Sequence, residues 1–312
     1  MPTSANWLLS ANPSRPLPGT LKISPYLQLI RLPNLFTAMA DVLAGYCLVL
    51  GTSIKLQDLF CLMLASACIY GGGCALNDLC DLEIDRRERP SRPLPSGAVS
   101  PRAALLLSVA LLGLGWAAAA LVNRSAFGLA GLLVTLVVSY DCLTKDIPFL
   151  GAFNMAACRG ANLTLGMMAI WPGMPFGDLV VFPLISMGYV YWLTALSKFE
   201  NCGNTPLSRR VVILVGLLVV LSLPGGLVVA GLLSTAAFLP LGGLLLMLAP
   251  PLLHWSRQPT PALTGRAVKT LVLGLPLLDM AYVMGTQDWR LGLPILFCIG
   301  LAAGAAKFME MH

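Results

Sequence analysis

Charged residues are scarce in this sequence. Asp, Glu, Lys and Arg make up only 11% of its 312 residues, against 57% hydrophobic residues. Soluble domains carry about 25% charged and roughly 45–50% apolar residues. A soluble fold with so few charged residues could not shield this much apolar surface from water, so the composition indicates that lipid surrounds the protein. The composition therefore excludes an ordinary soluble domain and predicts an integral membrane protein.

Motifs of several other protein classes are also missing. No basic stripe carries interleaved aromatic residues, so nucleic acid is not an expected partner. The nine cysteines form no CxxC pair and are irregularly spaced, which argues against a zinc site and a disulfide framework. The first 25 residues lack an apolar stretch, which argues against a cleaved signal peptide. We expect residues 1–27 to form a cytoplasmic tail and residues 28–312 to form a single transmembrane domain.

Long apolar runs dominate the rest of the chain. A helix needs about 20 mostly apolar residues to cross a bilayer. Segments of this kind lie at residues 34–52, 58–77, 102–122, 125–140, 149–171, 179–197, 211–231, 233–253, 267–285 and 290–307. The last two are weaker, because Pro276 and Asp279 interrupt one of them. The sequence predicts an all-α polytopic bundle of about nine transmembrane helices, and both nine and ten crossings fit.

The basic residues orient this bundle. With a cytoplasmic N-terminus, most Lys and Arg fall on one side, including the loops around 77–101 and 198–210, and only Lys55, Arg124 and Arg290 fall on the other. Cytoplasmic loops of membrane proteins carry an excess of Lys and Arg. We therefore expect a bacterial inner-membrane or organelle-membrane protein whose 77–101 loop faces the cytoplasm.

Acidic residues gather where the second predicted span ends. Asp78, Asp81 and Asp85 are spaced i, i+3, i+7, so on a helix they share one face. Carboxylates crowded in this way repel one another unless a cation lies between them. Their oxygens suit Mg²⁺, which usually keeps some waters and bridges to substrate phosphates. The spacing predicts a Mg²⁺ site, with Asn77 as a further oxygen ligand.

Arginines follow the acids at 86, 87, 89 and 92. Guanidinium groups match the oxygens of phosphate in shape and charge. Carboxylates, metal and arginines together predict a diphosphate-binding site. The alternative is a solvated charged loop that obeys the positive-inside rule. That alternative explains the arginines but not three acids on one helical face.

These residues resemble a known family signature. The segment Asn77-Asp78-x-x-Asp81-x-x-x-Asp85, continued by Arg89-Pro90-x-Arg92-Pro93-Leu94-Pro95-Ser96-Gly97, resembles the first aspartate-rich motif of the UbiA superfamily of intramembrane prenyltransferases. Arg31-Leu32-Pro33-Asn34 resembles the opening signature of that family, and Tyr140 with Lys145 resembles its Tyr/Lys pair. The resemblance covers most of residues 28–210.

The resemblance implies a bundle around a lipid-accessible cavity, in which Mg²⁺ and basic groups bind a prenyl diphosphate and an acceptor attacks the allylic cation. It implies metal ligands at Asn77, Asp78, Asp81 and Asp85. It implies substrate contacts from Arg31, Asn34, Arg89, Arg92 and Lys198. The catalytic residues would be Asp78 and Asp81, Tyr140 and Lys145 at the leaving group, and Asp146 or Asp41 as the base for the acceptor.

The sequence departs from the family in its second aspartate-rich motif. The corresponding loop holds one acid, Glu200, beside Asn201. Glu200 is either a remaining metal ligand or an ordinary loop acid. Asp141 and Asp146 either compensate for the missing aspartates or pair with Lys145.

Ionisable residues within membrane spans are costly and usually functional. Asp41 and Arg159 are such residues, and we expect them to form a buried pair. Two interpretations remain open. The pair either fixes the register of two helices, or Arg159 with Asn154 and Asn162 lines a polar pocket for an acceptor rich in hydroxyl groups.

Together these features resemble the UbiA-like proteins of "Ebo" gene clusters. The expected function is Mg²⁺-dependent transfer of an isoprenyl group to a polar, cyclitol-like or other secondary-metabolite acceptor, with membrane lipids around the protein. The alternatives are a lipid-diphosphate-binding or export protein that has lost the chemistry, and a terpene cyclase of the same superfamily.

Overall fold

The structure is a computed structural model that describes residues 23–147, 149–170, 179–198, 206–257 and 260–310. Within these ranges every regular element is helical, which confirms the all-α prediction. Most of the expected N-terminal tail, residues 1–22, lies outside the described residues. The same holds for Glu200 and its neighbours at 199–205, so the site of the reduced second motif is not described.

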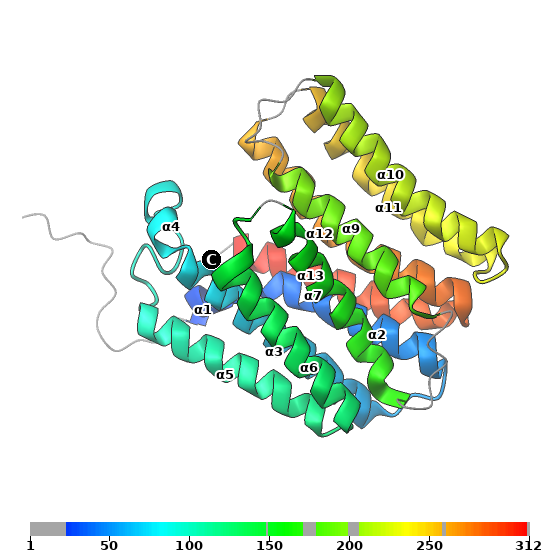
Figure 1. Cartoon of the computed structure of the whole chain (residues 1–312), viewed down its shortest axis with the longest axis horizontal. Coiled ribbons are helices and arrows are strands. Elements are labelled where there is room, and N and C mark those ends of the chain that lie inside the picture. The colour runs from blue at the N-terminus through cyan, green and yellow to red at the C-terminus, as the bar shows by residue number, and fades with distance from the viewer. Residues whose placement is uncertain (1–22, 148, 171–178, 199–205, 258–259, 311–312) are drawn as a thin grey trace, which may run out of the picture.

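The long helices lie side by side as a bundle (Figure 1). The first half contains α2 (Leu32–Leu50), α3 (Leu56–Cys80), α5 (Pro101–Ala120), α6 (Arg124–Ser139) and α7 (Leu150–Met167). The second half contains α9 (Val181–Lys198), α10 (Pro206–Val229), α11 (Phe238–Arg257), α12 (Pro261–Thr286) and α13 (Leu293–Glu310). These helices correspond one by one to the ten apolar segments of the sequence.

Eight helical segments are long and apolar enough to cross a membrane, among the residues described. The apolar segment of α9, Val181–Ser197, is shorter than these eight segments. Helix α7 is not one of the eight. Polar residues reduce the hydropathy of α7, which contains Asn154, Arg159 and Asn162. All three are buried inside the bundle rather than turned toward lipid, so α7 is a helix whose polar residues face protein.

Helix α2 forms the centre of the bundle, with α3, α7, α12 and α13 packed around it. Outer helices instead present apolar side chains such as Leu106, Leu218 and Phe297 on the surface. In water such a surface would be a liability, but in a bilayer it is the face that contacts lipid. The burial pattern thus agrees with a membrane environment.

Glycine allows α2 and α7 to approach closely. A Cβ atom on Gly45 would lie 2.1 Å from the backbone oxygen of Leu163, and one on Gly166 would lie 2.1 Å from that of Val42. Small residues at helix interfaces allow such backbone contact in membranes. The close approach brings the polar residues of α7 against α2.

Short elements complete the end of the bundle where the candidate site lies. They are α1 (Ile23–Leu29), α4 (Leu82–Glu88) and the π-helical turn η1 (Tyr140–Thr144). Near the opposite end lie η2 (Met168–Ile170), η4 (Thr235–Ala237) and η5 (Trp289–Gly292).

Candidate functional site

The candidate site begins where α3 ends. Asn77 and Asp78 lie in the last turn of α3, and Asp81 is the residue between α3 and α4. A single helix through 78–85 was the expectation, but α3 ends at Cys80 and the chain resumes as α4 at Leu82. Asp85 lies in α4, and its backbone N–H donates to Asp81 O at 2.8 Å. The bend therefore keeps Asp81 and Asp85 one turn apart.

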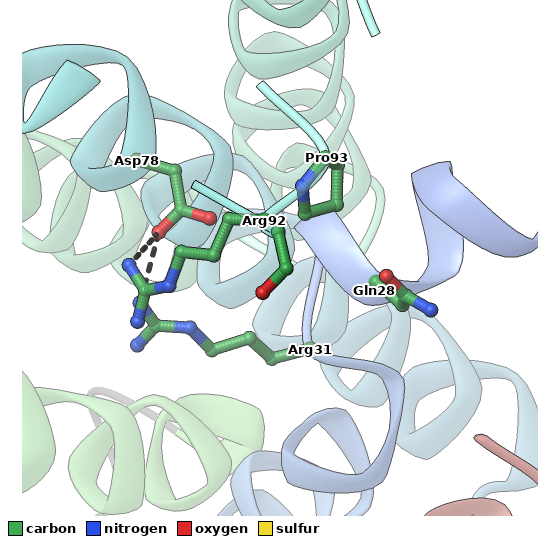
Figure 2. Close-up of a pocket in the computed structure, with 6 residues that line it drawn as sticks. Gln28, Arg31, Asp78, Arg92 and Pro93 are labelled. Carbon is green, nitrogen blue, oxygen red and sulfur yellow. Dashed lines mark hydrogen bonds and ion pairs between the residues drawn. The ribbon is translucent and has the colours of Figure 1, made fainter. Parts of the chain in front are cut away.

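Two arginines from different parts of the chain meet at Asp78. Arg31 donates to Asp78 Oδ1 at 3.0 Å, and Arg92 lies 3.5 Å from the same oxygen (Figure 2). The Asp78 residue is only 5% exposed. Arg31 adopts a left-handed backbone, with φ 53° and ψ 56°, between α1 and α2. Such a conformation is uncommon for a residue other than glycine and often marks a functional position.

The local sequence explains the break at Arg31. Pro33, at the start of α2, has no backbone N–H and is well suited to the first turn of a helix. A single helix running on from α1 would need the Pro33 nitrogen to donate to the carbonyl of Leu29, and proline has no N–H to donate. The chain turns at this point, and the turn brings the Arg31 side chain to Asp78.

Asp85 organises the arginines that follow it. Arg92 lies 2.6 Å from Asp85 Oδ2, and Arg89 lies 3.7 Å from Asp85 Oδ1. Asp85 is 2% exposed, so its carboxylate is engaged by guanidinium groups in a sheltered position. The loop beyond is anchored by a small core that includes Leu94 and Val99. The Arg92 side chain is consequently held between two buried carboxylates.

The turn η1 supplies a second group of partners. Lys145, just after η1, forms an ion pair with Asp81. Asn77 Nδ2 donates to Asp141 Oδ1 at 3.0 Å, and Asp141 is buried. π-helical turns are rare and frequently occur at functional sites. This turn brings two of the sequence-predicted residues, Asp141 and Lys145, onto the end of α3.

The side chain of Asn154, from α7, makes hydrogen bonds that hold the turn η1 in place. In the orientation that satisfies both ends of its amide, Oδ1 accepts from Ser139 Oγ at 2.8 Å and Thr144 Oγ1 at 2.9 Å, and Nδ2 donates to Leu136 O at 3.1 Å. Asn154 thus contacts residues immediately before η1 and at its end. The arrangement makes it a support of the turn.

A pocket of about 300 Å³ opens beside Asp78 (Figure 2). It is lined by Gln28, Arg31, Asp78, Ser91, Arg92 and Pro93. Two guanidinium groups against one carboxylate make this a site for an anion. The sequence arguments missed Gln28 and Ser91. In the sequence, Gln28 is distinguished only by lying three residues before Arg31, and Ser91 only by lying one residue before Arg92.

No group of three acidic, His or Cys side chains is arranged to hold a metal ion among the described residues. Asp78, Asp81 and Asp85 instead each contact a basic side chain. Mg²⁺ is commonly bound through one or two carboxylates together with substrate phosphates and water. Asp78 and Asp81, with the amide oxygen of neighbouring Asn77, form an oxygen donor set that fits this requirement. Asp85 is the least suited, because both of its oxygens already contact arginines.

Other predicted residues lie around this centre. Tyr140 is half-buried at the start of η1, and Asp146 is exposed beside Lys145. Asn34 lies in the first turn of α2, where its side chain is close to that of Tyr70. Lys198 is the last residue of α9, and its side chain is not described. Tyr70 is a further contact that no sequence motif indicated.

A second polar cluster lies within the membrane-spanning region. Arg159 of α7 forms an ion pair with Asp41 of α2, which confirms the expected contact, and donates to Thr37 O at 3.0 Å. Asn162 Nδ2 donates to Asp41 Oδ2 at 2.9 Å. The carboxyl group of Asp279, from α12, also interacts with Asp41. The cluster joins three helices, and Asp279 is a member that sequence reasoning did not connect to it.

Comparison with known proteins adds a family assignment to this geometry. Residues 38–266 match the model described as "UbiA prenyltransferase family". The chain is 29% identical over 180 residues to a digeranylgeranylglyceryl phosphate synthase from Sulfolobus acidocaldarius, covering 57% of this chain and 62% of that protein. Two further synthases are covered over 55% and 63% of their lengths. The chain thus spans somewhat less than two thirds of the curated relatives it matches.

Solved structures share the fold. A digeranylgeranylglyceryl phosphate synthase structure superposes with a TM-score of 0.63 at 20% identity, covering 84% of this chain and 98% of that chain. A UbiA homologue from Archaeoglobus fulgidus, bound to GPP and Mg²⁺, superposes with a TM-score of 0.53 at 17% identity, covering 92% of this chain and all of that one. At these identities the likeness concerns the fold alone.

Proposed function

The chain belongs to the UbiA prenyltransferase family, and on that premise we propose that it transfers an isoprenyl group from a prenyl diphosphate to an acceptor within the membrane. The observation that carries this proposal is the convergence of Arg31 and Arg92 on Asp78 beside an anion-sized pocket. A diphosphate is the anion that would use both the guanidinium groups and a metal-binding carboxylate. Related proteins are named digeranylgeranylglyceryl phosphate synthases, and a UbiA homologue of the same fold was solved bound to GPP and Mg²⁺.

The basic residues would hold the leaving diphosphate. Arg31 and Arg92 line the pocket, and Lys145 contacts the nearby Asp81. As the allylic C–O bond breaks, negative charge grows on the diphosphate oxygens, and fixed cations stabilise that charge. The backbone N–H of Lys145 donates to Tyr140 O at 3.0 Å across η1, and we assign to the Tyr140 hydroxyl a hydrogen bond to the same leaving group. Asn77, Asp78 and Asp81 would hold Mg²⁺, which when bound withdraws electron density from the diphosphate.

Substrate binding requires an exchange of partners. In the structure Asp78 and Asp81 are neutralised by Arg31, Arg92 and Lys145. A diphosphate in the pocket would draw the basic groups to its oxygens, and the Asp78 and Asp81 carboxylates would then be free to hold Mg²⁺. Asp85 keeps Arg92 oriented during this exchange, because Arg92 contacts Asp85 at a shorter distance than Asp78. We assign Asp85 to that positioning role in preference to metal ligation.

The proposed acceptor is a polar molecule with several hydroxyl groups, in line with the resemblance to the Ebo-type branch. Two buried atoms support it, since Arg159 Nε and Asp279 Oδ2 have no hydrogen-bond partner in the described part of the chain. Buried polar atoms without partners are costly, and a hydroxyl group satisfies either one. Asp41 lies between these residues and is the proposed acceptor base in this interior position; Asp146 is the alternative at the surface.

A second function is favoured by one observation. The acids of the site are all engaged by basic side chains, and no three-acid cluster is formed in the described residues. A protein that binds or exports a lipid diphosphate without cleaving it would show this arrangement. We place the site at the cytoplasmic face in either case, because the 77–101 loop is rich in arginine.

The test is an assay of purified protein in lipid nanodiscs with Mg²⁺ and prenyl diphosphates of several chain lengths. Release of pyrophosphate together with a prenylated acceptor supports the transferase. Release with a cyclic hydrocarbon and no acceptor indicates a cyclase, and Mg²⁺-dependent binding without release indicates the binding protein. Asp78→Asn should abolish release. Asp58→Asn, at the opposite end of the same helix, is the matched control and should retain activity.

A further inference from the structure

Two exposed thiols lie in contact at the edge of the site. Cys80, the last residue of α3, and Cys142, in η1, have their Sγ atoms 3.8 Å apart. Both side chains are exposed. The other described cysteines are buried or partly buried: Cys47, Cys61, Cys68, Cys74, Cys158 and Cys298. Buried cysteines behave as small hydrophobes, whereas an exposed pair in contact is open to chemistry.

The pair joins the two elements that carry the site. Cys80 stands between Asp78 and Asp81, and Cys142 directly follows Asp141. Two polar contacts cross the same gap, from Asn77 to Asp141 and from Lys145 to Asp81. A covalent bond between the two sulfurs would therefore fasten α3 to η1 within one turn of the proposed metal ligands.

We propose that Cys80 and Cys142 form a modification site that a peroxide-class oxidant converts into a disulfide, holding the diphosphate site in the arrangement described above. A disulfide places its sulfurs about 2.0 Å apart, so they must approach by roughly 1.8 Å. Both side chains are exposed, so neither thiol is held in place by a packed core.

The peroxide accepts the two electrons that the two thiols lose when the disulfide forms. One thiol, as its thiolate, attacks a peroxide oxygen, the O–O bond breaks, and a sulfenic acid forms while one molecule of water or alcohol leaves. The second thiol attacks the sulfenic sulfur, the S–S bond forms, and water leaves. Two thiols are oxidised, and one peroxide is reduced. A dithiol reductant then reduces the disulfide back to two thiols by thiol–disulfide exchange and is itself oxidised to a disulfide.

Locking these elements would slow the proposed reaction. Substrate binding requires Lys145 to leave Asp81, and this ion pair bridges α3 and the end of η1. A disulfide between the same elements holds that contact together, so the oxidised protein should turn over prenyl diphosphate several-fold more slowly. The effect on turnover rests on the proposed function, whereas formation of the bond does not.

The test uses the full-length protein in nanodiscs, treated with hydrogen peroxide. Mass spectrometry of a non-reducing digest should find a peptide pair linked through Cys80 and Cys142. Pyrophosphate release should fall several-fold and recover after treatment with dithiothreitol. Absence of the linked peptide, or a linked protein with unchanged turnover, would overturn the inference.

Two variants sharpen the test. Cys142→Ala should keep the reduced-state activity and lose both the linked peptide and the peroxide response. Cys61→Ala removes a buried thiol from the same helix as Cys80, and it should respond like the wild type. A Cys142→Ala protein that peroxide still inhibits would show that another residue is responsible. If the reduced wild type releases no pyrophosphate but the linked peptide forms, the proposed function has failed and the modification site stands.

Discussion

Arg159 and Asp41 form an ion pair inside the bundle, with the Arg159 residue 8% exposed and the Asp41 residue 1% exposed. Taking two charges out of water is costly, so removing one partner from such a pair leaves the other uncompensated. Asp279 also interacts with Asp41. The cluster is therefore one cation with two carboxyl groups, and its members should respond unequally to substitution.

Arg159→Met should be the most damaging change in this cluster. It leaves Asp41 and Asp279 facing each other without a cation, and breaking a buried pair in this way costs about 3–5 kcal/mol. Asp41→Asn should cost less, because Asp279 stays close to Arg159. Unfolding in detergent, followed by circular dichroism, measures both. The double variant should be more stable than the sum of the single variants predicts, and strict additivity would contradict a direct interaction.

Arg92→Lys should weaken substrate binding although the charge is kept. The Arg92 guanidinium contacts both Asp78 and Asp85, and a lysine ammonium lacks the planar geometry for two such partners. Loss of one charge-assisted hydrogen bond costs about 1.5–3 kcal/mol, so KM for prenyl diphosphate should rise roughly tenfold or more. Arg86→Lys is the control, since its pair with Glu83 is exposed and worth little. An equal rise in KM in both variants would argue against a special role for Arg92.

Hydropathy alone predicted the long helices, because a bilayer demands long apolar segments whatever their neighbours are. The pairing of Asp41 with Arg159 followed from the same physics, since two opposite charges buried among apolar helices have few other partners. Both predictions depend on the hydropathy and the charges of single segments, which the sequence shows directly.

Other features depend on tertiary packing and were not predictable. At the break of α3 at Asp81 and at the π-helical turn η1, the contacts join segments far apart in sequence, from Lys145 to Asp81 and from Asn77 to Asp141. One of the two interpretations of the Asp41–Arg159 pair placed Asn154 beside Arg159 in an acceptor pocket. Asn154 instead contacts Ser139 and Thr144, a partnership that no sequence spacing reveals.

Gly45→Ala should destabilise the bundle. The added Cβ atom would lie 2.1 Å from the backbone oxygen of Leu163, far inside van der Waals contact, so α2 and α7 must separate. Gly113→Ala in α5 is the matched control, because a Cβ there meets nothing within 4 Å. Alanine is favoured over glycine in a helix by about 0.5–1 kcal/mol, so Gly113→Ala should be neutral or stabilising. Thermal unfolding in the same detergent measures both, and similar melting temperatures for the two variants would contradict the close approach.

Asn154→Ala should impair catalysis through η1 rather than through direct contact with substrate. Its amide joins the end of α6 to the end of η1, and removal leaves buried polar groups unsatisfied at a cost of about 1–3 kcal/mol. Because η1 leads directly into Lys145, we expect kcat for pyrophosphate release to fall while the protein stays folded.

Asn123→Ala provides a control of similar kind, since Asn123 caps α6 at its other end and donates to Met168 O. It should lose comparable stability, about 1 kcal/mol for a helix cap, and keep its kcat. An equal loss of kcat in both variants would show that general destabilisation, and not the support of η1, accounts for the effect.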